Sequence, residues 1–331
     1  MNPVSHEKKT QMYSTFGDKL LQHTDVLNLI QNHKRFKPIT VQLAPTEVCD
    51  LKCHYCSVDN RPIRNMIPFE TIEKGLRDFA SLGAKSVEIT GGGNPLLYHK
   101  INDVIAVAKD CGLQIGVITN SYKPTRYLTQ TSIDSLTWIR VSLSALDFNQ
   151  EREFDLSGIP SSKLGLSYIV SEQKTNERII ERASEIARKY DVKFVRIAPD
   201  CLSEYSLKIK QDWDHVIQKY DTEGKMFIKE IEDNFHPYPG GCYVGMVRPY
   251  WVSTGVYICS SHVLKTQKYE PEWKMYDIQD VLKFYNEANE RFADGKNPYE
   301  IDISKCFHCY YFNNNKLLTT VVTELPDKNF A

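Results

Sequence analysis

The stretch that decides the fold and the chemistry of this chain is Cys49-Asp50-Leu51-Lys52-Cys53-His54-Tyr55-Cys56. It places three cysteines in a C-x3-C-x2-C pattern, with an aromatic residue just before the last cysteine. Thiolates are the soft ligands that iron–sulfur clusters and zinc select. A structural zinc site is normally closed by four protein ligands, so three clustered cysteines leave one position open for another molecule.

Two other interpretations of this loop have to be weighed. His54 lies between two of the cysteines and could complete a zinc site as a fourth ligand. Disulfide bonding fits less well, because the chain is not small and its nine cysteines are an odd number. Clustered cysteines in an enzyme-sized chain argue for metal binding or catalysis.

The loop resembles the cluster loop of the radical S-adenosylmethionine (radical SAM) enzymes. In that family three cysteines hold a 4Fe-4S cluster, and the amine and carboxylate of SAM chelate the fourth iron. The resemblance implies that Cys49, Cys53 and Cys56 bind this cluster. It also implies that Tyr55 packs near the cluster and the adenine of SAM.

Composition sets broad limits on the protein. The chain has 331 residues, of which 41% are apolar and 25% charged, as in ordinary globular proteins. No secretory signal precedes the first helical pattern, and no apolar run approaches the roughly 18 residues needed to cross a bilayer. We therefore expect a cytoplasmic protein, which suits an oxygen-sensitive cluster. The formal net charge of −1 does not favour a nucleic-acid partner.

Strand and helix patterns alternate along the first two thirds of the chain. A leading helix is predicted at 12–34, and further helices at 69–82, 98–111 and 175–190. Strands are predicted at 39–44, 86–90, 113–119, 138–144, 164–170 and 192–198. Such alternation implies right-handed βαβ units and a parallel sheet, with ligands at the carboxyl ends of the strands. The α/β order resembles the partial (β/α)6 TIM-like barrel of radical SAM enzymes, over roughly residues 38–200.

A glycine turn follows the second predicted strand. Gly91, Gly92 and Gly93 allow a close approach of backbone to ligand and expose amide groups, although a tight strand-to-helix turn would need glycine as well. With Asn94 and Pro95 they resemble the family's GGEP motif, whose turn and acidic residue contact the methionine amine of SAM. Here Asn94 replaces the glutamate, so its carbonyl oxygen could accept from the ammonium without supplying charge.

Other polar residues lie near predicted strand ends. The resemblance implies that Asn120 lies near the SAM ribose, and that Ser142 and Ser144, on one side of the fourth strand, bind the ribose or carboxylate. Ordinary inward-facing polar packing is the alternative for the serines. Arg196 lies on an apolar strand and needs an anionic partner, which could be the SAM carboxylate or a structural salt bridge.

Four further cysteines lie in the last third of the chain: Cys242, Cys259, Cys306 and Cys309. A hairpin at 251–259 and a helix at 278–292 separate them. Three interpretations compete: a second, auxiliary 4Fe-4S cluster, a structural zinc site, and unligated buried cysteines. The first is preferred, since the spacing resembles the cluster-binding "twitch" domain of 2-deoxy-scyllo-inosamine dehydrogenases. The predicted domains are 1–37, a helical segment, 38–200, the barrel, and 201–331, a helical connection with the twitch-type domain.

The predicted function follows from this resemblance. It implies reductive cleavage of SAM to a 5′-deoxyadenosyl radical, which abstracts hydrogen from a small polar substrate such as a sugar, cyclitol or nucleotide. A second cluster could then accept an electron and complete an oxidation. Cys201 is a candidate hydrogen-atom donor or a core residue, and Arg248 and His262 are candidates for proton transfer. An electron donor such as flavodoxin or ferredoxin is implied.

Other functions stay open at this stage. The alternative enzymatic reactions are epimerisation or rearrangement of the substrate, and modification of a peptide or a nucleic acid. From another class, the chain could be a zinc-stabilised binding module without redox chemistry.

Overall fold

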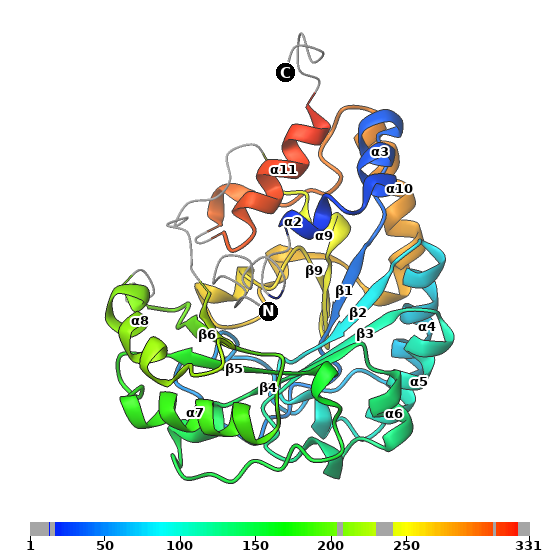
Figure 1. The fold of residues 1–331 in the computed structure, drawn as a ribbon. Helices are drawn as coiled ribbons and strands as arrows, with labels where there is room; N and C mark the ends of the chain where they lie inside the picture. The colour runs from blue at the N-terminus through cyan, green and yellow to red at the C-terminus, as the bar shows by residue number, and fades with distance from the viewer. Residues whose placement is uncertain (1–12, 14–16, 204–207, 230–240, 307–308, 324–331) are drawn as a thin grey trace.

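The computed structural model describes residues 13, 17–203, 208–229, 241–306 and 309–323. These residues form one curved sheet of ten strands in the order β10-β9-β8-β1-β2-β3-β4-β5-β6-β7, with helices along its outer face (Figure 1). The strands are β1 Thr40–Leu43, β2 Ser86–Ile89, β3 Gln114–Thr119, β4 Trp138–Ser142, β5 Leu164–Val170, β6 Phe194–Pro199, β7 Met226–Ile228, β8 Tyr250–Val252, β9 Gly255–Tyr257 and β10 Lys274–Tyr276. The run from β8 to β7 is parallel throughout, and β9 and β10 are antiparallel.

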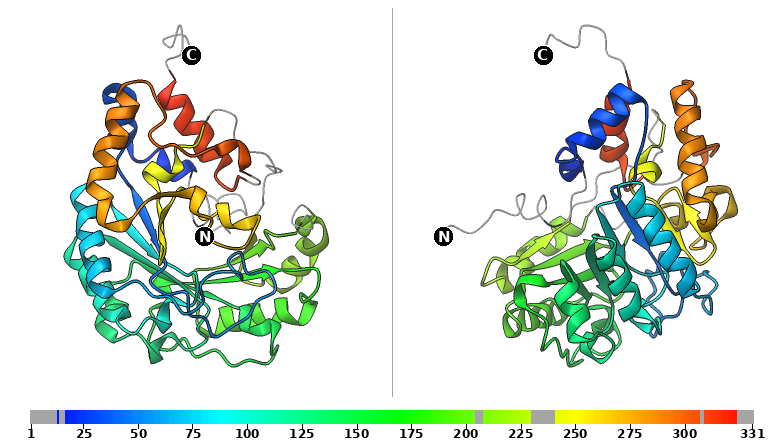
Figure 2. Two further views of the ribbon diagram at one scale, coloured as in Figure 1. Left: turned by 180° about the vertical axis from the view of Figure 1, so that it is seen from behind. Right: turned by 90° about the vertical axis from the view of Figure 1, so that its right-hand side faces the viewer.

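The described residues also form helices, several of which connect the strands and cover the convex side of the sheet. They are α2 Gly17–Leu20, α3 Thr24–His33, α4 Phe69–Ser81, α5 Ile101–Asp110, α6 Gln130–Ser135, α7 Glu177–Lys189, α8 Ile209–Tyr220, α9 Val244–Val247, α10 Val281–Ala293 and α11 Phe312–Val322. Figure 2 shows α4 to α7 outside the sheet, while α2, α3, α9 and α11 gather beyond one end of it. Since β1 to β8 are parallel, their carboxyl ends lie at one edge.

One face of the sheet is apolar, and the other borders a large cavity of mixed polar and apolar lining. On β2, for example, burial alternates: Val87 and Ile89 are almost fully buried, whereas Ser86 and Glu88 are half-buried beside the cavity. This follows from the period of two along a strand, which places alternate side chains on opposite faces. The α/β class and the partial-barrel architecture predicted from the sequence are confirmed, with an open sheet.

Three details of the prediction were wrong. The alternation does not stop near residue 200, because α8 leads into a seventh parallel strand, β7, within the stretch expected to be mostly helical. The leading helix is split into α2 and α3 by a turn at Leu21 and Gln22. The fourth strand ends at Ser142, because the backbone of Leu143 (φ −84°, ψ 17°) leaves the extended region.

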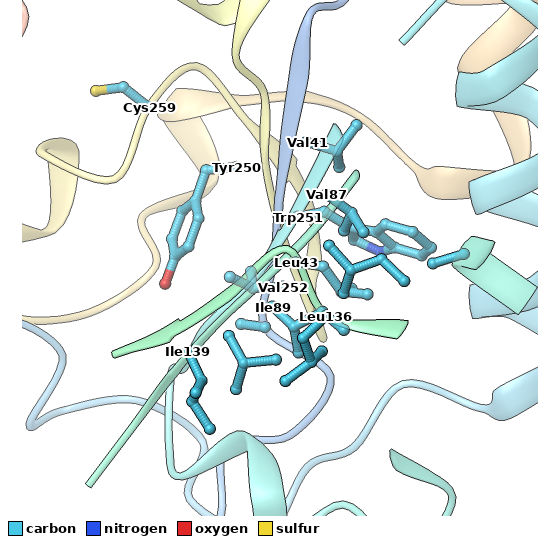
Figure 3. Packing of buried hydrophobic residues seen from close by; sticks show 14 of the residues in the cluster. Val41, Leu43, Val87, Ile89, Leu136, Ile139, Tyr250, Trp251, Val252 and Cys259 are labelled. Atoms are coloured by element: carbon cyan, nitrogen blue, oxygen red, sulfur yellow. The ribbon is translucent and has the colours of Figure 1, made fainter. Parts of the chain in front are cut away.

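The predicted hairpin and the helix after it are present as β8–β9 and α10, but β8 has a further role. It pairs in parallel with β1, so the C-terminal third extends the sheet at the strand that leads into the cysteine loop. Figure 3 shows Trp251 and Tyr250 of β8 pointing to opposite sides. Trp251 is fully buried and packs against α4, with its ring centroid 6.0 Å from that of Phe79.

Among the residues that the structure describes, no helix is both long and apolar enough to span a bilayer.

The packing of Trp251 gives a stability prediction. Trp251→Ala should lower the free energy of unfolding by about 3–5 kcal/mol, because it leaves a cavity between β8 and α4. The control, Leu282→Ala on α10, removes a side chain that is 40% exposed and should change stability by less than about 1 kcal/mol. Urea denaturation measures both, and equal losses would contradict this account of the interface.

Candidate active site

The cysteine loop begins directly after β1 and is closed at its base by backbone pairing. The N–H of Glu47 donates to the carbonyl of Asn65 at 2.9 Å, and the N–H of Ile67 donates to that of Pro45 at 3.0 Å. Within the loop, the N–H of Cys56 donates to the carbonyl of Cys53 at 3.1 Å. This turn brings the last two cysteines of the predicted trio together at the carboxyl edge of the sheet.

The three thiols are half-buried and close enough to influence one another electrostatically. Burial raises the pKa of Cys53 to about 12, and the nearby Cys49 and Cys56 also raise it, against a hydrogen bond from Tyr55 that lowers it. A cationic iron–sulfur cluster would offset the mutual repulsion of three thiolates here. Within the described ranges no three His, Cys, Asp or Glu side chains are arranged for a single metal ion.

The glycine turn packs directly on this loop. The N–H of Gly93 donates to the carbonyl of Thr46 at 3.0 Å, and the N–H of Asn94 donates to that of Val48 at 2.8 Å. A Cβ on Gly93 would lie 1.9 Å from the Val48 oxygen, and one on Gly92 would lie 1.5 Å from a carboxylate oxygen of Glu47. Glycine is thus required because the chain's own cysteine loop approaches so closely.

Asn94 is fully buried, and its side chain joins three elements. Its Oδ1 accepts from Thr119 Oγ1 at 2.8 Å and from the N–H of Leu96 at 3.2 Å, and its Nδ2 donates to Asp50 Oδ1 at 3.2 Å. A carbonyl oxygen has two lone pairs, so the atom expected to accept from SAM already has two donors. Asn94 therefore holds the cysteine loop against the ends of β2 and β3.

Asn120 and the two serines lie around the same loop. Asn120 Nδ2 is 3.2 Å from Asp50 Oδ1 and 3.7 Å from Cys49 Sγ. Hydrogen bonds to a ligand sulfur are one means by which a protein tunes the potential of a cluster. Ser144 begins a short 3-10 turn beyond β4, yet its Oγ is 2.7 Å from that of Ser142, so the two hydroxyls remain adjacent.

Tyr55 is held by a half-buried carboxylate that no sequence pattern indicated. Its hydroxyl donates to Asp147 Oδ2 at 2.9 Å, and the hydroxyl of Tyr168 donates to the other oxygen at 2.6 Å. Burial raises the pKa of Asp147, while these two hydrogen bonds act in the opposite direction. Tyr55 is 8% exposed, so this network fixes the aromatic residue beside the last cysteine.

The C-terminal segment braces the cysteine loop from the other side. Gln267 Nε2 donates to the carbonyl of Cys56 at 2.8 Å, and Tyr269 donates to Glu47 Oε2 at 2.7 Å. Arg61, within the loop, has Nη1 3.6 Å from Cys56 Sγ. The contacts of Gln267 and Tyr269 connect residues about 200 positions apart, and no sequence pattern indicated them.

The four later cysteines lie around one cavity. Cys242, Cys259, Cys306 and Cys309 line one small cavity of about 30 Å³. Asn315 on α11 holds this region, since its Nδ2 is 3.6 Å from Cys242 Sγ and 3.8 Å from Cys309 Sγ. Its Oδ1 accepts from the N–H groups of Tyr243 and Val244. Four thiols around one cavity can supply a complete ligand set for an iron–sulfur cluster.

His262 belongs to this second cysteine site. It lines the same small cavity, its Nδ1 is 2.5 Å from the carbonyl oxygen of Cys259, and its ring stacks on Tyr257 with a centroid distance of 4.7 Å. Burial lowers its pKa to about 4, so the imidazole is neutral near pH 7. The large concave cavity is not lined by His262.

That large cavity has a volume of about 920 Å³, includes a cysteine of the second site and extends to neighbours of the first. Ser57 and Gly91 line it beside the first site, and Ser260, Ser261 and Cys309 line it beside the second. Cys201 and Arg248, two of the predicted catalytic residues, also line it. Arg248 is paired with Glu88, a residue missed by the sequence analysis, with Nη2 3.0 Å from Oε1.

Asn94 provides a direct test of this architecture. Asn94→Asp should lower the free energy of unfolding by about 2–3 kcal/mol, because it replaces a buried donor by a carboxylate that faces Asp50. Asn149→Asp is the control, since this exposed residue uses only its Oδ1, as an acceptor from the N–H of Glu151. Chemical denaturation of both variants measures the difference. An Asn94 variant as stable as the control would contradict the assigned contacts.

Comparison with known proteins agrees with this fold. The structure is similar to SuiB from Streptococcus suis, at 16% identity and a TM-score of 0.55, over 85% of this chain and 77% of SuiB. SuiB bound to the precursor peptide SuiA matches at 18% identity and a TM-score of 0.53, over 82% of this chain and 70% of that one. Native anSMEcpe with bound AdoMet matches at 12% identity and a TM-score of 0.50, over 86% and 96%.

The sequence comparison is more specific than these structural likenesses, which at such identities show the fold alone. The match to the radical SAM superfamily begins at the end of β1 and extends into β6. It thus includes the first three cysteines, the glycine turn and Asp147. Residues 43–197 of this chain therefore match the radical SAM superfamily, a match that implies an enzyme that uses a 4Fe-4S cluster and SAM.

Proposed function

We propose that this protein oxidises a small polar substrate by radical SAM chemistry with the help of a second 4Fe-4S cluster. Cys49, Cys53 and Cys56 would hold the first cluster. Cys242, Cys259, Cys306 and Cys309 would hold the second, and the substrate, a sugar, cyclitol or nucleotide, would occupy the large cavity.

One observation carries the proposal: a single cavity of about 920 Å³ is lined by Cys309 of the second cysteine site and by Ser57 and Gly91, which lie next to the first. A substrate in it would lie between a site for radical generation and a second site able to accept an electron. The volume is suited to a small molecule, since ligand pockets usually enclose about 300–1,000 Å³. Polar and charged side chains on its strands suit a polar substrate.

The oxidation removes one hydrogen atom, one electron and one proton from the substrate. The cofactors, when bound, supply a 5′-deoxyadenosyl radical that takes one hydrogen atom from the substrate carbon, and a second cluster that takes one electron. The remaining proton leaves the hydroxyl or amine, which becomes a ketone or imine. The electron for SAM cleavage would come from a donor such as flavodoxin or ferredoxin.

The chain's own residues would position SAM and exclude water. The glycine turn and Asn120 border the first site, and Ser142 and Ser144 offer two adjacent hydroxyls nearby. Among the predicted catalytic residues, Cys201 lines the cavity with a thiol whose pKa is raised by burial, which keeps it protonated. That state suits a hydrogen-atom donor and would serve an epimerase as well.

Peptide modification is the second candidate. It is favoured by the similarity to SuiB bound to the precursor peptide SuiA. The two candidates differ in substrate size, so a panel of sugars, nucleotides and short peptides separates them. The measured quantity is substrate-dependent formation of 5′-deoxyadenosine. Stimulation by peptides alone would replace the small-molecule proposal.

Iron content tests the two-cluster assignment. After anaerobic reconstitution we expect about eight irons per chain, and about four in Cys259→Ala or in Cys53→Ala. Cys53→Ala should also form no 5′-deoxyadenosine. The control is Cys111→Ala, at the end of α5 and outside both sites, which should keep about eight irons.

Two results would contradict the assignment. About four irons with one zinc would make the second site structural. Zinc without absorbance at about 400 nm would indicate a binding module instead.

A further inference from the structure

Three cations line one part of the large cavity, below the carboxyl edge of the sheet. Arg140 lies on β4 and Arg196 on β6, on either side of β5, where they pair with Gly165 and Ser167. Lys229 follows β7, and its N–H donates to the carbonyl of Ile197 on β6 at 2.7 Å. All three side chains line the cavity.

The described part of the chain balances their charge only in part: Arg140 and Lys229 lie over the rings of Trp138 and Tyr310, and Glu88 opposes the lowering of the pKa of both arginines. The one carboxylate among the described lining residues is Glu88, which accepts from Arg248 at 3.0 Å and from Gln42 Nε2 at 2.9 Å. Over the described ranges, Arg140, Arg196 and Lys229 form no ion pair. The Nε atoms of both arginines are buried and without an acceptor there.

Arg140, Arg196 and Lys229 are half-buried in the cavity wall, where partial removal from water is costly for a charged group. Burial lowers the pKa of Arg196, and the charge of Arg140 lowers it further. Burial also lowers the pKa of Lys229 to about 7, and Arg196 adds to the effect. Unpaired buried cations are expensive, so such a group is expected where a ligand supplies the opposite charge.

We propose that Arg140, Arg196 and Lys229 bind the phosphate group of the substrate. This inference rests on the proposed function, because it places the substrate in the same cavity and narrows it to a phosphorylated sugar, cyclitol or nucleotide.

Phosphate matches these groups better than a single carboxylate does. A phosphate monoester carries up to two negative charges and three free oxygens, whereas a carboxylate would neutralise one cation of three. Arginine forks bind such oxygens in pairs, and lysine adds a point charge. The cations come from strands β4 and β6 and from the end of β7, a spread that suits a tetrahedral group.

Binding of inorganic phosphate to the reconstituted protein tests the proposal. Calorimetric titration should show about one phosphate per chain, and Arg140→Gln combined with Arg196→Gln should weaken it by about tenfold or more. The control is Arg77→Gln on α4, an exposed residue paired with Glu73, which should bind phosphate like the wild type. Acetate, as the single-carboxylate probe, should bind more weakly than phosphate. No phosphate binding, equal affinity in the double variant, or preference for acetate would overturn the proposal.

Two further measurements distinguish a loss of phosphate binding from unfolding of the variant and from a role of the cations in SAM binding. Phosphate should raise the melting temperature of the wild type and not of the double variant. A cooperative melting transition of the double variant shows that it is folded. Titration with SAM alone tests whether Arg196 binds the SAM carboxylate instead of a phosphate group. If SAM displaces phosphate and the double variant weakens both equally, the cations serve the SAM carboxylate and the proposal fails. Absence of 5′-deoxyadenosine formation would instead overturn the proposed function, since phosphate binding is measured without turnover.

Discussion

The backbone pairing between the glycine turn and the cysteine loop is the constraint on which the site depends. Two hydrogen bonds from Gly93 and Asn94 to the loop leave no space for a side chain at the glycines. The Asn94 side chain extends this contact to Asp50 and to the end of β3. The cysteine loop, although irregular, is thereby held by regular strands, as a precisely placed metal site requires.

Much of the fold could be predicted because its signals are local. The six central strands have clear apolar and β-branched patterns, and the alternation with helices determines a parallel sheet. β7 was missed because its three residues carry too short a pattern. The pairing of β8 with β1 was missed because it joins positions about 200 residues apart, which periodicity cannot indicate.

Less of the candidate site than of the fold could be predicted from the sequence. Cysteines grouped by spacing could be assigned, and the structure brings Cys242 and Cys259 together with the later pair. Asp147 and Glu88 could not be found, because a single carboxylate in a strand or turn looks like a solvent-facing residue until its partners are known. The sequence could single out Arg196 as a cation in need of an anion, and this stays a prediction; its companions Arg140 and Lys229 required the register of the sheet.

The pairing of β8 with β1 has a consequence for how the protein is made. During synthesis, β1 is an unprotected edge strand until residue 250 has left the ribosome, and the α4 surface that receives Trp251 stays open for the same period. A nascent chain that ends after β6 therefore exposes both a strand edge and an apolar groove next to the cysteine loop. Strands β1 and β8 therefore have to pair before the cysteine loop can be enclosed.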